Sequence, residues 1–563
     1  MKPRSTESRD ALAAARVPAA RGALEMPDRR EFLHAGVMGG VAAAFAPLTG
    51  SADTREKHDV PAFELDEISI GELQDGMKAG KFTAHSIAEK YLGRIEAIDK
   101  RGPAINAVIE INPEALEIAR ALDQERKEKG PRGPLHGVPI LIKDNIDTAD
   151  RMMTTAGSLA LVGSKPLKDS GVAQRLRAAG MVILGKTNLS EWANIRSNHS
   201  TSGWSGRGGL TKNPYSLDRN ACGSSSGSGA GIAANLCVAA IGTETDGSIV
   251  CPSATNGIVG IKPTVGLVSR AGIIPISHTQ DGAGPMCRSV RDAAMVLGAL
   301  TGRDEEDGAT AASAGKALID YTPFLDAGGL KGARIGVVRK YSGFSDFVDT
   351  LLAAALEVMK DRGAEIVDPC DVPNMNKLDE NEMNVMMFEL KADLNAYLSR
   401  LGPNAPVHTL QEVIEFNEKH HEKEMPYFGQ DLFLKAQAKG PLTTEEYLNA
   451  LGKNQQFARA DGIDAVMDKL KLDALVAPTG GPAWITDLPT GDHSAGGSST
   501  LAAVAGYPAI TVPMGFTFGL PVGISFFGRA WSEGVLIKLA FAYEQASKLR
   551  KAPQFLPRIS LKA

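Results

Sequence analysis

The stretch between residues 135 and 300 alternates short apolar runs with clusters of Gly, Ser, Thr and Asn, and this pattern constrains the fold more than any other feature of the sequence. A run of four or five residues that is apolar at every position has the length of a β-strand and is typical of a strand buried on both faces. The runs cover residues 138–142, 181–184, 238–241 and 258–261. The pattern predicts an α/β fold in which helices cover both faces of a large mixed β-sheet.

Helical patterns flank these runs. In the segment 65–130, Ser69 and Glu72 have the spacing of a capping box, so we expect an N-terminal helical part there. Residues 131–300 would then form the core of one compact domain spanning residues 53–563. Beyond this core the sequence predicts strands at 333–338, 475–477, 509–512 and 522–526, and helices at 347–362, at 531–549 and, as several charged helices, at about 374–470.

The first 52 residues resemble an N-terminal extension followed by a twin-arginine export signal. Arg29 and Arg30 precede an apolar run over residues 35–48, and small residues follow at positions 50–52. The run is too short for a comfortable membrane span, which needs roughly 20 residues, so stable membrane insertion is not expected. We expect contact with the twin-arginine export machinery, cleavage near Ala52 and a periplasmic or secreted enzyme. The sequence leaves open whether translation starts at Met1 or Met26.

Composition excludes some functions. The formal net charge is -5 over 563 residues, and no basic run is interleaved with aromatic residues, so nucleic-acid binding is disfavoured. The cysteines lack the close pairs of a zinc site or a disulfide framework, and we expect them to be small buried apolar residues. They are Cys222, Cys237, Cys251, Cys287 and Cys370.

Two glycine-containing motifs suggest chemistry that their surroundings oppose. Gly180 to Thr187 matches the phosphate-loop pattern, but its residues 181–184 form an expected buried strand whose N–H groups must pair within the sheet, which argues against nucleotide binding. Gly223 to Gly227 matches a nucleophile elbow, which needs a preceding strand, whereas residues 213–220 are polar and contain a proline. The elbow hypothesis stays open on composition alone, because several histidines could complete a triad: His408, His420, His421 and His493.

A third motif, Gly242 to Ser248, directly follows the apolar run 238–241. A strand that leads into a glycine-containing turn can present the Ser248 hydroxyl and the N–H groups of the turn to one ligand, as acyl transfer requires. Taken alone, the same pattern is also that of an ordinary polar turn.

Blocks spread over residues 65–555 resemble the amidase signature family. The hallmark region lies between Cys222 and Val290, and further matching blocks lie on both sides of it. The blocks are Leu-His-Gly-Val-Pro-Ile-Leu-Ile-Lys-Asp-Asn at 135–145, Gly-Ser-Ser-Ser-Gly-Ser at 223–228, Glu-Thr-Asp-Gly-Ser at 244–248, Gly-Ile-Val-Gly-Ile-Lys-Pro-Thr at 257–264, Gly-Pro-Met at 284–286, Ala-Gly-Tyr-Pro-Ala at 505–509 and Gly-Leu-Pro-Val-Gly at 519–523. Within the family, residues 190–194, 244–248 and 388–395 look most like the bacterial peptide amidases.

The resemblance implies an amidohydrolase that works through an acyl-enzyme. Matched block by block, Ser248 is the nucleophile, Ser224 is a bridging hydroxyl that follows a cis peptide bond, and Lys143 is the base. No metal or organic cofactor is expected for this chemistry. The oxyanion hole would be made by the backbone N–H groups of Thr245, Asp246, Gly247 and Ser248.

Lys143 can act as a base only as a neutral amine, and an ordinary lysine, with a pKa of about 10.4, is charged at neutral pH. Burial at the end of the run 138–142 would lower this pKa. A carboxylate at Asp144 would raise it on contact, but strand alternation points the two side chains to opposite faces. We expect Thr243 and Asp281 to support the site through hydrogen bonds, and His136 to be a structural turn residue.

The natural substrate is left open by the sequence. The peptide-amidase resemblance favours C-terminal amides of short peptides, while aryl amides, small aliphatic amides and esters fit the same chemistry. An ammonia-supplying amidotransferase subunit and a non-catalytic peptide-binding scaffold are further alternatives. The helices at about 374–470 would wall the substrate groove, although we expect Phe388, Tyr397 and Phe428 to serve core packing more than substrate contact. The oligomeric state is not predicted.

Overall fold

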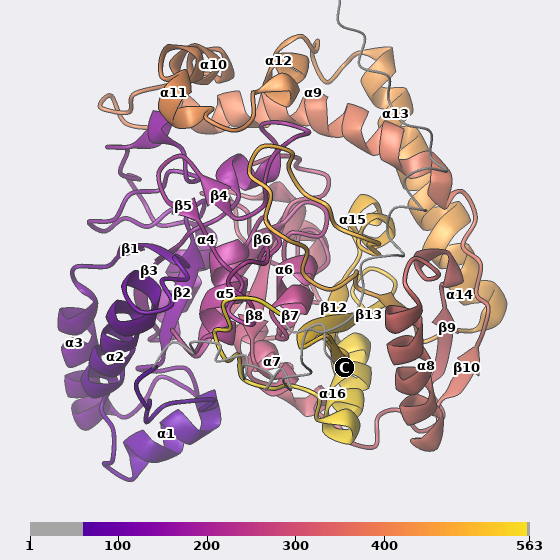
Figure 1. The fold of residues 1–563 in the computed structure, drawn as a ribbon, viewed down its shortest axis with the longest axis horizontal. Helices are drawn as coiled ribbons and strands as arrows, with labels where there is room; N and C mark the ends of the chain where they lie inside the picture. Colours follow the sequence, from indigo (N-terminus) through magenta and orange to yellow (C-terminus); the bar gives the residue numbers. More distant parts are fainter. Residues whose placement is uncertain (1–59, 560–563) are drawn as a thin grey trace, which may run out of the picture. The chain divides into compact units, whose positions relative to one another are not determined.

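The computed structural model describes residues 60–559, and the expected export signal therefore lies outside the described residues. Its centre is an 11-stranded mixed sheet with the strand order β1-β3-β2-β6-β8-β7-β12-β13-β11-β9-β10 (Figure 1). The strands are β1 (Val108–Ile111), β2 (Pro139–Lys143), β3 (Val182–Thr187), β6 (Ala239–Glu244), β7 (Val259–Lys262), β8 (Gly282–Cys287), β9 (Arg334–Val337), β10 (Glu365–Val367), β11 (Ala474–Pro478), β12 (Ala509–Thr517) and β13 (Leu520–Phe527); β4 (Trp204–Ser205) and β5 (Gly209–Leu210) form a separate hairpin.

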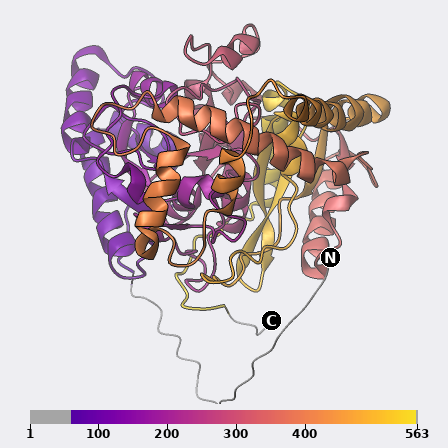
Figure 2. The same ribbon diagram turned by 90° about the horizontal axis from the view of Figure 1, so that it is seen from above.

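Helices cover both faces of this sheet, which confirms the predicted fold class. The helices are α1 (Ile70–Lys78), α2 (Ala84–Arg94), α3 (Ala115–Lys129), α4 (Gly171–Ala178), α5 (Ser226–Ala233), α6 (Val250–Thr255), α7 (Val290–Leu300), α8 (Asp346–Asp361), α9 (Leu378–Leu398), α10 (Leu410–Lys419), α11 (His421–Glu424), α12 (Asp431–Gln437), α13 (Glu445–Gln455), α14 (Asp464–Leu470), α15 (Thr500–Ala505) and α16 (Glu533–Ser547). Figure 2 shows the long helix α9 running across the molecule. No helix within residues 60–559 is both long and apolar enough to cross a membrane.

The predicted strands of the core are present, and they are fully buried as their apolar composition indicates. Three strands of the main sheet, β1, β8 and β10, were not anticipated, and neither was the β4–β5 hairpin. The strand β8 lies between β6 and β7, but its Gly-Ala-Gly-Pro-Met-Cys sequence has no apolar run. The edge strand β1 falls inside the segment predicted to be helical; it pairs with β3 through Val108, Glu110 and Ile111.

Sheet topology places the ends of two neighbouring strands together. The strands β2 and β6 are parallel, with Ile142 opposite Ile241, so the C-terminal ends of both strands lie on the same side of the sheet. Residues directly after parallel strands therefore meet at one edge of the sheet, which is where open α/β sheets bind ligands. Here that edge carries Lys143 from β2 and the turn after Glu244 from β6.

Candidate active site

Lys143 is the last residue of β2, and its side chain is fully buried beside β6. Its Nζ atom lies 2.7 Å from Ser224 Oγ, 2.9 Å from Thr243 Oγ1 and 3.2 Å from the Thr243 carbonyl oxygen. Burial lowers the pKa of Lys143 to about 7, against the opposing effect of Glu244 and Asp281. The amine therefore has a substantial neutral fraction at neutral pH, as a lysine that acts as a base requires.

Ser224 lies in the loop that precedes α5, and the Gly223–Ser224 peptide bond is cis, as the family resemblance implies. The next residue connects this loop to the third motif, because the Ser225 backbone N–H donates to the Ser248 carbonyl oxygen at 3.2 Å. Ser225 Oγ also donates to the Thr243 carbonyl oxygen at 3.1 Å. The structure thus brings Lys143, Ser224 and the Ser248 turn together from three separate blocks of the sequence.

The turn from Thr245 to Ser248 presents its backbone to the site. Gly247 has a φ of 79°, a conformation that favours glycine. The Glu244 carboxylate accepts the N–H groups of Ile249 and Val250, at 2.6 and 2.9 Å, and so fixes the chain just beyond the turn. Within residues 60–559, the four N–H groups of the turn have no acceptor, which leaves them available to an oxyanion.

The expected supporting residues occupy the expected places. Asp281 Oδ1 accepts a hydrogen bond from Thr245 Oγ1 at 2.6 Å, and burial raises the pKa of Asp281 to about 6. Asp144 binds Thr155 Oγ1 at 2.5 Å and the Arg207 guanidinium at 3.3 Å rather than Lys143. Sequence reasoning missed Asn145, whose Nδ2 donates to Thr243 Oγ1 at 2.9 Å, although its position two residues after Lys143 could have indicated it.

The competing motifs have structural roles. Lys186 of the phosphate-loop pattern is buried at the end of β3, where its Nζ donates to the Ile146 carbonyl oxygen at 2.5 Å and to Thr154 Oγ1 at 2.8 Å. The residues that precede Gly223 form a loop and not a strand, so the elbow hypothesis is wrong. The Nε2 atom of His136 lies 2.9 Å from the Leu122 carbonyl oxygen, in agreement with a structural histidine.

Comparison with known proteins identifies the family of this chain. The amidase family model matches residues 86–537. This chain belongs to the amidase signature family. A protein of Arabidopsis thaliana named probable amidase is 43% identical over 504 residues, which is 88% of this chain and 93% of the relative.

Two solved structures of peptide amidase are more similar still in sequence. The crystal structure of native peptide amidase from Stenotrophomonas maltophilia has a TM-score of 0.83 and 50% identity, covering 88% of this chain and all of that one. The structure of the peptide amidase in complex with the competitive inhibitor chymostatin has a TM-score of 0.84 and 50% identity, and covers 87% of this chain and all of that one.

The amidase site contains a disulfide that sequence reasoning did not expect. Cys222 and Cys251 are 29 residues apart in the sequence and are joined, with 6.1 Å between their Cα atoms. Prediction failed because the sheet, and not local spacing, brings the loop before Ser224 next to the helix after Ser248. The bond links the two segments that carry the serines. Among the described residues, three cysteines are free and buried, as expected: Cys237, Cys287 and Cys370.

Two cavities open beside the end of the sheet that carries Lys143 and the turn at 245–248. One, of about 260 Å³, reaches Thr243 and Thr245 and is bounded by Ala396 and Tyr397 of α9. The other, of about 220 Å³, is bounded by Gly223, by the Asp246–Gly247 part of the turn and by the disulfide, and extends to Trp484. Of the three aromatic residues considered above, Tyr397 lines the first of these two cavities and the other two line neither; Phe388 packs on Tyr447 and Phe428 on Trp204.

The disulfide predicts a thiol count. Protein unfolded in denaturant without reductant should show three reactive thiols, and five after reduction. The double variant Cys222→Ser, Cys251→Ser should show three under both conditions. It should also lose about 3–4 kcal/mol of stability, because the unfolded chain is no longer cross-linked. Thiol titration and urea unfolding measure these quantities, and five thiols without reductant would contradict the bond.

Proposed function

We propose that this amidase hydrolyses C-terminal amides of peptides, with Ser248 as nucleophile, Ser224 as bridging hydroxyl and Lys143 as base. The observation that carries the catalytic assignment is the 2.7 Å contact between Lys143 Nζ and Ser224 Oγ, next to the turn that bears Ser248. In this arrangement the buried amine of Lys143 can take a proton from Ser224 while Ser224 takes the proton of Ser248.

In the proposed first step, neutral Lys143 takes the proton of Ser224 while Ser224 takes the proton of Ser248. The Ser248 oxygen attacks the carbonyl carbon, and the negative charge on the substrate oxygen is held by the free N–H groups of residues 245–248. Losing one donor of this kind typically costs ~3–4 kcal/mol of transition-state stabilisation. The proton on Lys143 then returns through Ser224 to the leaving nitrogen, which departs as ammonia.

In the second step, water attacks the acyl-enzyme along the same proton path, and the carboxylic acid is released with Ser248 regenerated. All protons that move are carried by Lys143, Ser224 and Ser248. Glu244 and Asp281 keep the Lys143 pKa from falling further, which preserves enough basicity for proton abstraction.

The peptide preference is supported by the 50% identity to peptide amidase over the full length of that enzyme. It is also supported by two adjacent cavities, which offer room on both sides of the turn to a substrate longer than a simple amide. Aryl amides, simple amides and esters are the alternatives that a substrate panel must separate.

Ammonia release should be confined to amidated dipeptides and tripeptides in a panel that also holds aryl acylamides and aliphatic amides. Ser248→Ala should lower kcat by at least about 10⁴-fold, because no other residue replaces the nucleophile. Cleavage of the other amides with equal efficiency would overturn the peptide preference and keep the mechanism. Activity that persists in Ser248→Ala would overturn the assignment of the nucleophile.

The Lys143 pKa predicts an acid limb in the pH dependence. Because the neutral amine is the active form, kcat should rise with pH around a midpoint of about 7. Below the midpoint it should fall about tenfold per pH unit, as for a single ionisation. Steady-state rates in buffers of constant ionic strength test this. Lys143→Arg should abolish the activity, and a kcat that is unchanged between about pH 5 and pH 8 would contradict the role of Lys143.

We further propose that the enzyme is exported by the twin-arginine route and acts in the periplasm or outside the cell. The pair Arg29 and Arg30 before the apolar run supports this proposal. The Cys222–Cys251 disulfide supports it independently, because disulfides persist mainly in oxidising compartments.

Cell fractionation tests export. The variant Arg29→Lys, Arg30→Lys should keep the enzyme in the cytoplasm with its N-terminal segment intact, because the paired arginines are needed for recognition. The matched control Arg16→Lys, Arg21→Lys changes two arginines upstream of the pair and should be exported normally. Wild-type export should expose a new N-terminus near Asp53. Equal distribution of all three proteins would contradict the proposal.

A further inference from the structure

Helix α9 directs three acidic side chains at one loop. Glu382, Glu389 and Asp393 are spaced by seven and four residues, so they lie along one face of the helix. All three accept hydrogen bonds from the segment 276–281, which immediately precedes β8. The loop and α9 are about 100 residues apart in sequence, so this contact is entirely tertiary.

Glu389 is the centre of this contact and is fully buried. Its Oε2 accepts Ser277 Oγ at 2.5 Å, the Thr279 N–H at 3.1 Å and Thr279 Oγ1 at 3.0 Å. Its Oε1 accepts the hydroxyl of Tyr447 at 2.7 Å. A carboxylate is needed to accept four hydrogen bonds at two oxygens, since an amide offers only one oxygen.

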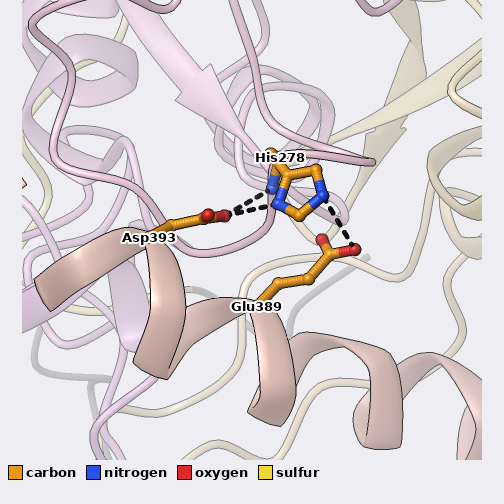
Figure 3. Close-up of side chains that lie close together, drawn as sticks. All are labelled: His278, Glu389 and Asp393. Atoms are coloured by element: carbon orange, nitrogen blue, oxygen red, sulfur yellow. Dashed lines mark hydrogen bonds and ion pairs between the residues drawn. The ribbon is translucent and has the colours of Figure 1, made fainter. Parts of the chain in front are cut away.

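His278 completes the contact with α9 (Figure 3). Its backbone N–H and its Nδ1 lie 3.0 and 2.8 Å from Asp393 Oδ2, and its Nε2 lies 3.5 Å from Glu389 Oε1. The hydrogen bond to Asp393 raises the pKa of His278, as the nearby Glu389 also does. These three side chains are of the types that bind cations, but the oxygens of Glu389 already accept hydroxyl and N–H donors. We therefore interpret the cluster as hydrogen bonds that fix the loop 276–281 to α9, and not as a metal site.

The far end of the same loop holds the turn that bears Ser248. Gln280 Nε2 donates to Glu382 Oε1 at 2.7 Å and lies 3.4 Å from the Thr245 carbonyl oxygen. Asp281 binds Thr245 Oγ1 through Oδ1, and its Oδ2 accepts the N–H groups of Ile276 and Ser277 at 2.8 and 2.9 Å. The side chain and the carbonyl oxygen of Thr245 are thus both contacted by residues of a loop that is hydrogen-bonded to α9.

We propose that Glu389 is a positioning residue of the amidase, which fixes the loop 276–281 and through it the Thr245 end of the oxyanion hole. The inference rests on the proposed role of the N–H groups at 245–248. Glu389 does not touch the reacting atoms. Its effect reaches them through Ser277 and Thr279, then Asp281 and Gln280, then Thr245.

The test is Glu389→Gln, which keeps the shape and removes one strong acceptor. Per titrated active site, kcat on the amide that wild type cleaves fastest should fall about 10- to 30-fold, because a displaced N–H group stabilises the oxyanion less. The KM should change less than about twofold, since the Glu389 side chain itself lines neither of the two cavities beside the turn. The rate at which a fluorophosphonate labels Ser248 should fall in parallel. Glu380→Gln, an exposed carboxylate on the same helix, is the matched control and should leave both rates unchanged.

A milder variant and a coupling measurement separate positioning from folding. Ser277→Ala removes one of the donors to Glu389 and should lower kcat in the same direction, by about threefold, even if Glu389→Gln folds poorly. Adding Asp281→Asn to Glu389→Gln should cost less than the product of the two single effects, because both act on Thr245 through one loop.

The outcomes are distinct from those that test the proposed function. Loss of activity in Ser248→Ala together with wild-type kcat and labelling rates in Glu389→Gln and Ser277→Ala would overturn this inference alone. A lower melting temperature with unchanged kcat per active site would also overturn it, because Glu389 would then serve stability only. Activity that persists in Ser248→Ala would instead refute the catalytic assignment on which the inference rests.

Discussion

Burial of the Lys143 amine at the end of β2 is the constraint around which the site is arranged. A buried ammonium without a paired carboxylate is costly, so the surroundings favour the neutral form. A neutral amine has two N–H donors and one lone pair. The carbonyl oxygen and Oγ1 of Thr243 can accept the two donors, which leaves the lone pair for the hydroxyl of Ser224. The hydrogen-bond inventory therefore matches a base poised to take the Ser224 proton, and Asn145 keeps Thr243 Oγ1 in place.

Burial alone does not make a lysine a base, as two other buried lysines of this chain illustrate. Burial lowers the pKa of Lys262 to about 8, and it also lowers that of Lys186. Within the described residues, Lys262 donates to the Tyr507 carbonyl oxygen, and Lys186 to a carbonyl oxygen and a threonine hydroxyl. The difference is the neighbour. Of these three lysines, Lys143 alone lies beside a serine in a loop that is hydrogen-bonded to a turn with free N–H groups.

This contrast shows what the sequence could and could not predict. Apolar runs identified the core strands, because a strand buried on both faces must be apolar along its length. They missed β8, whose small residues let it fit closely between β6 and β7: a Cβ on Gly284 would lie 1.9 Å from the Ile261 carbonyl oxygen. The motif after the run 238–241 made Ser248 a candidate, but only the family blocks assigned roles to Lys143, Ser224 and Ser248, since no local pattern distinguishes Lys143 from Lys186. The disulfide and the acidic face of α9 depend on tertiary contacts, to which sequence spacing gives no guide.

The turn at 245–248 explains why distant elements must converge on this edge. Four consecutive backbone N–H groups without internal acceptors are unfavourable in a folded protein, and such a turn would relax if it were free. It is held from outside at several points: Glu244 fixes the start of α6, Ser225 holds the Ser248 carbonyl, and the loop before β8 grips Thr245. Each support satisfies a group other than the free N–H groups, which leaves them available for the proposed oxyanion. The four N–H groups can stay without acceptors because hydrogen bonds fix the neighbouring groups of the turn on both sides.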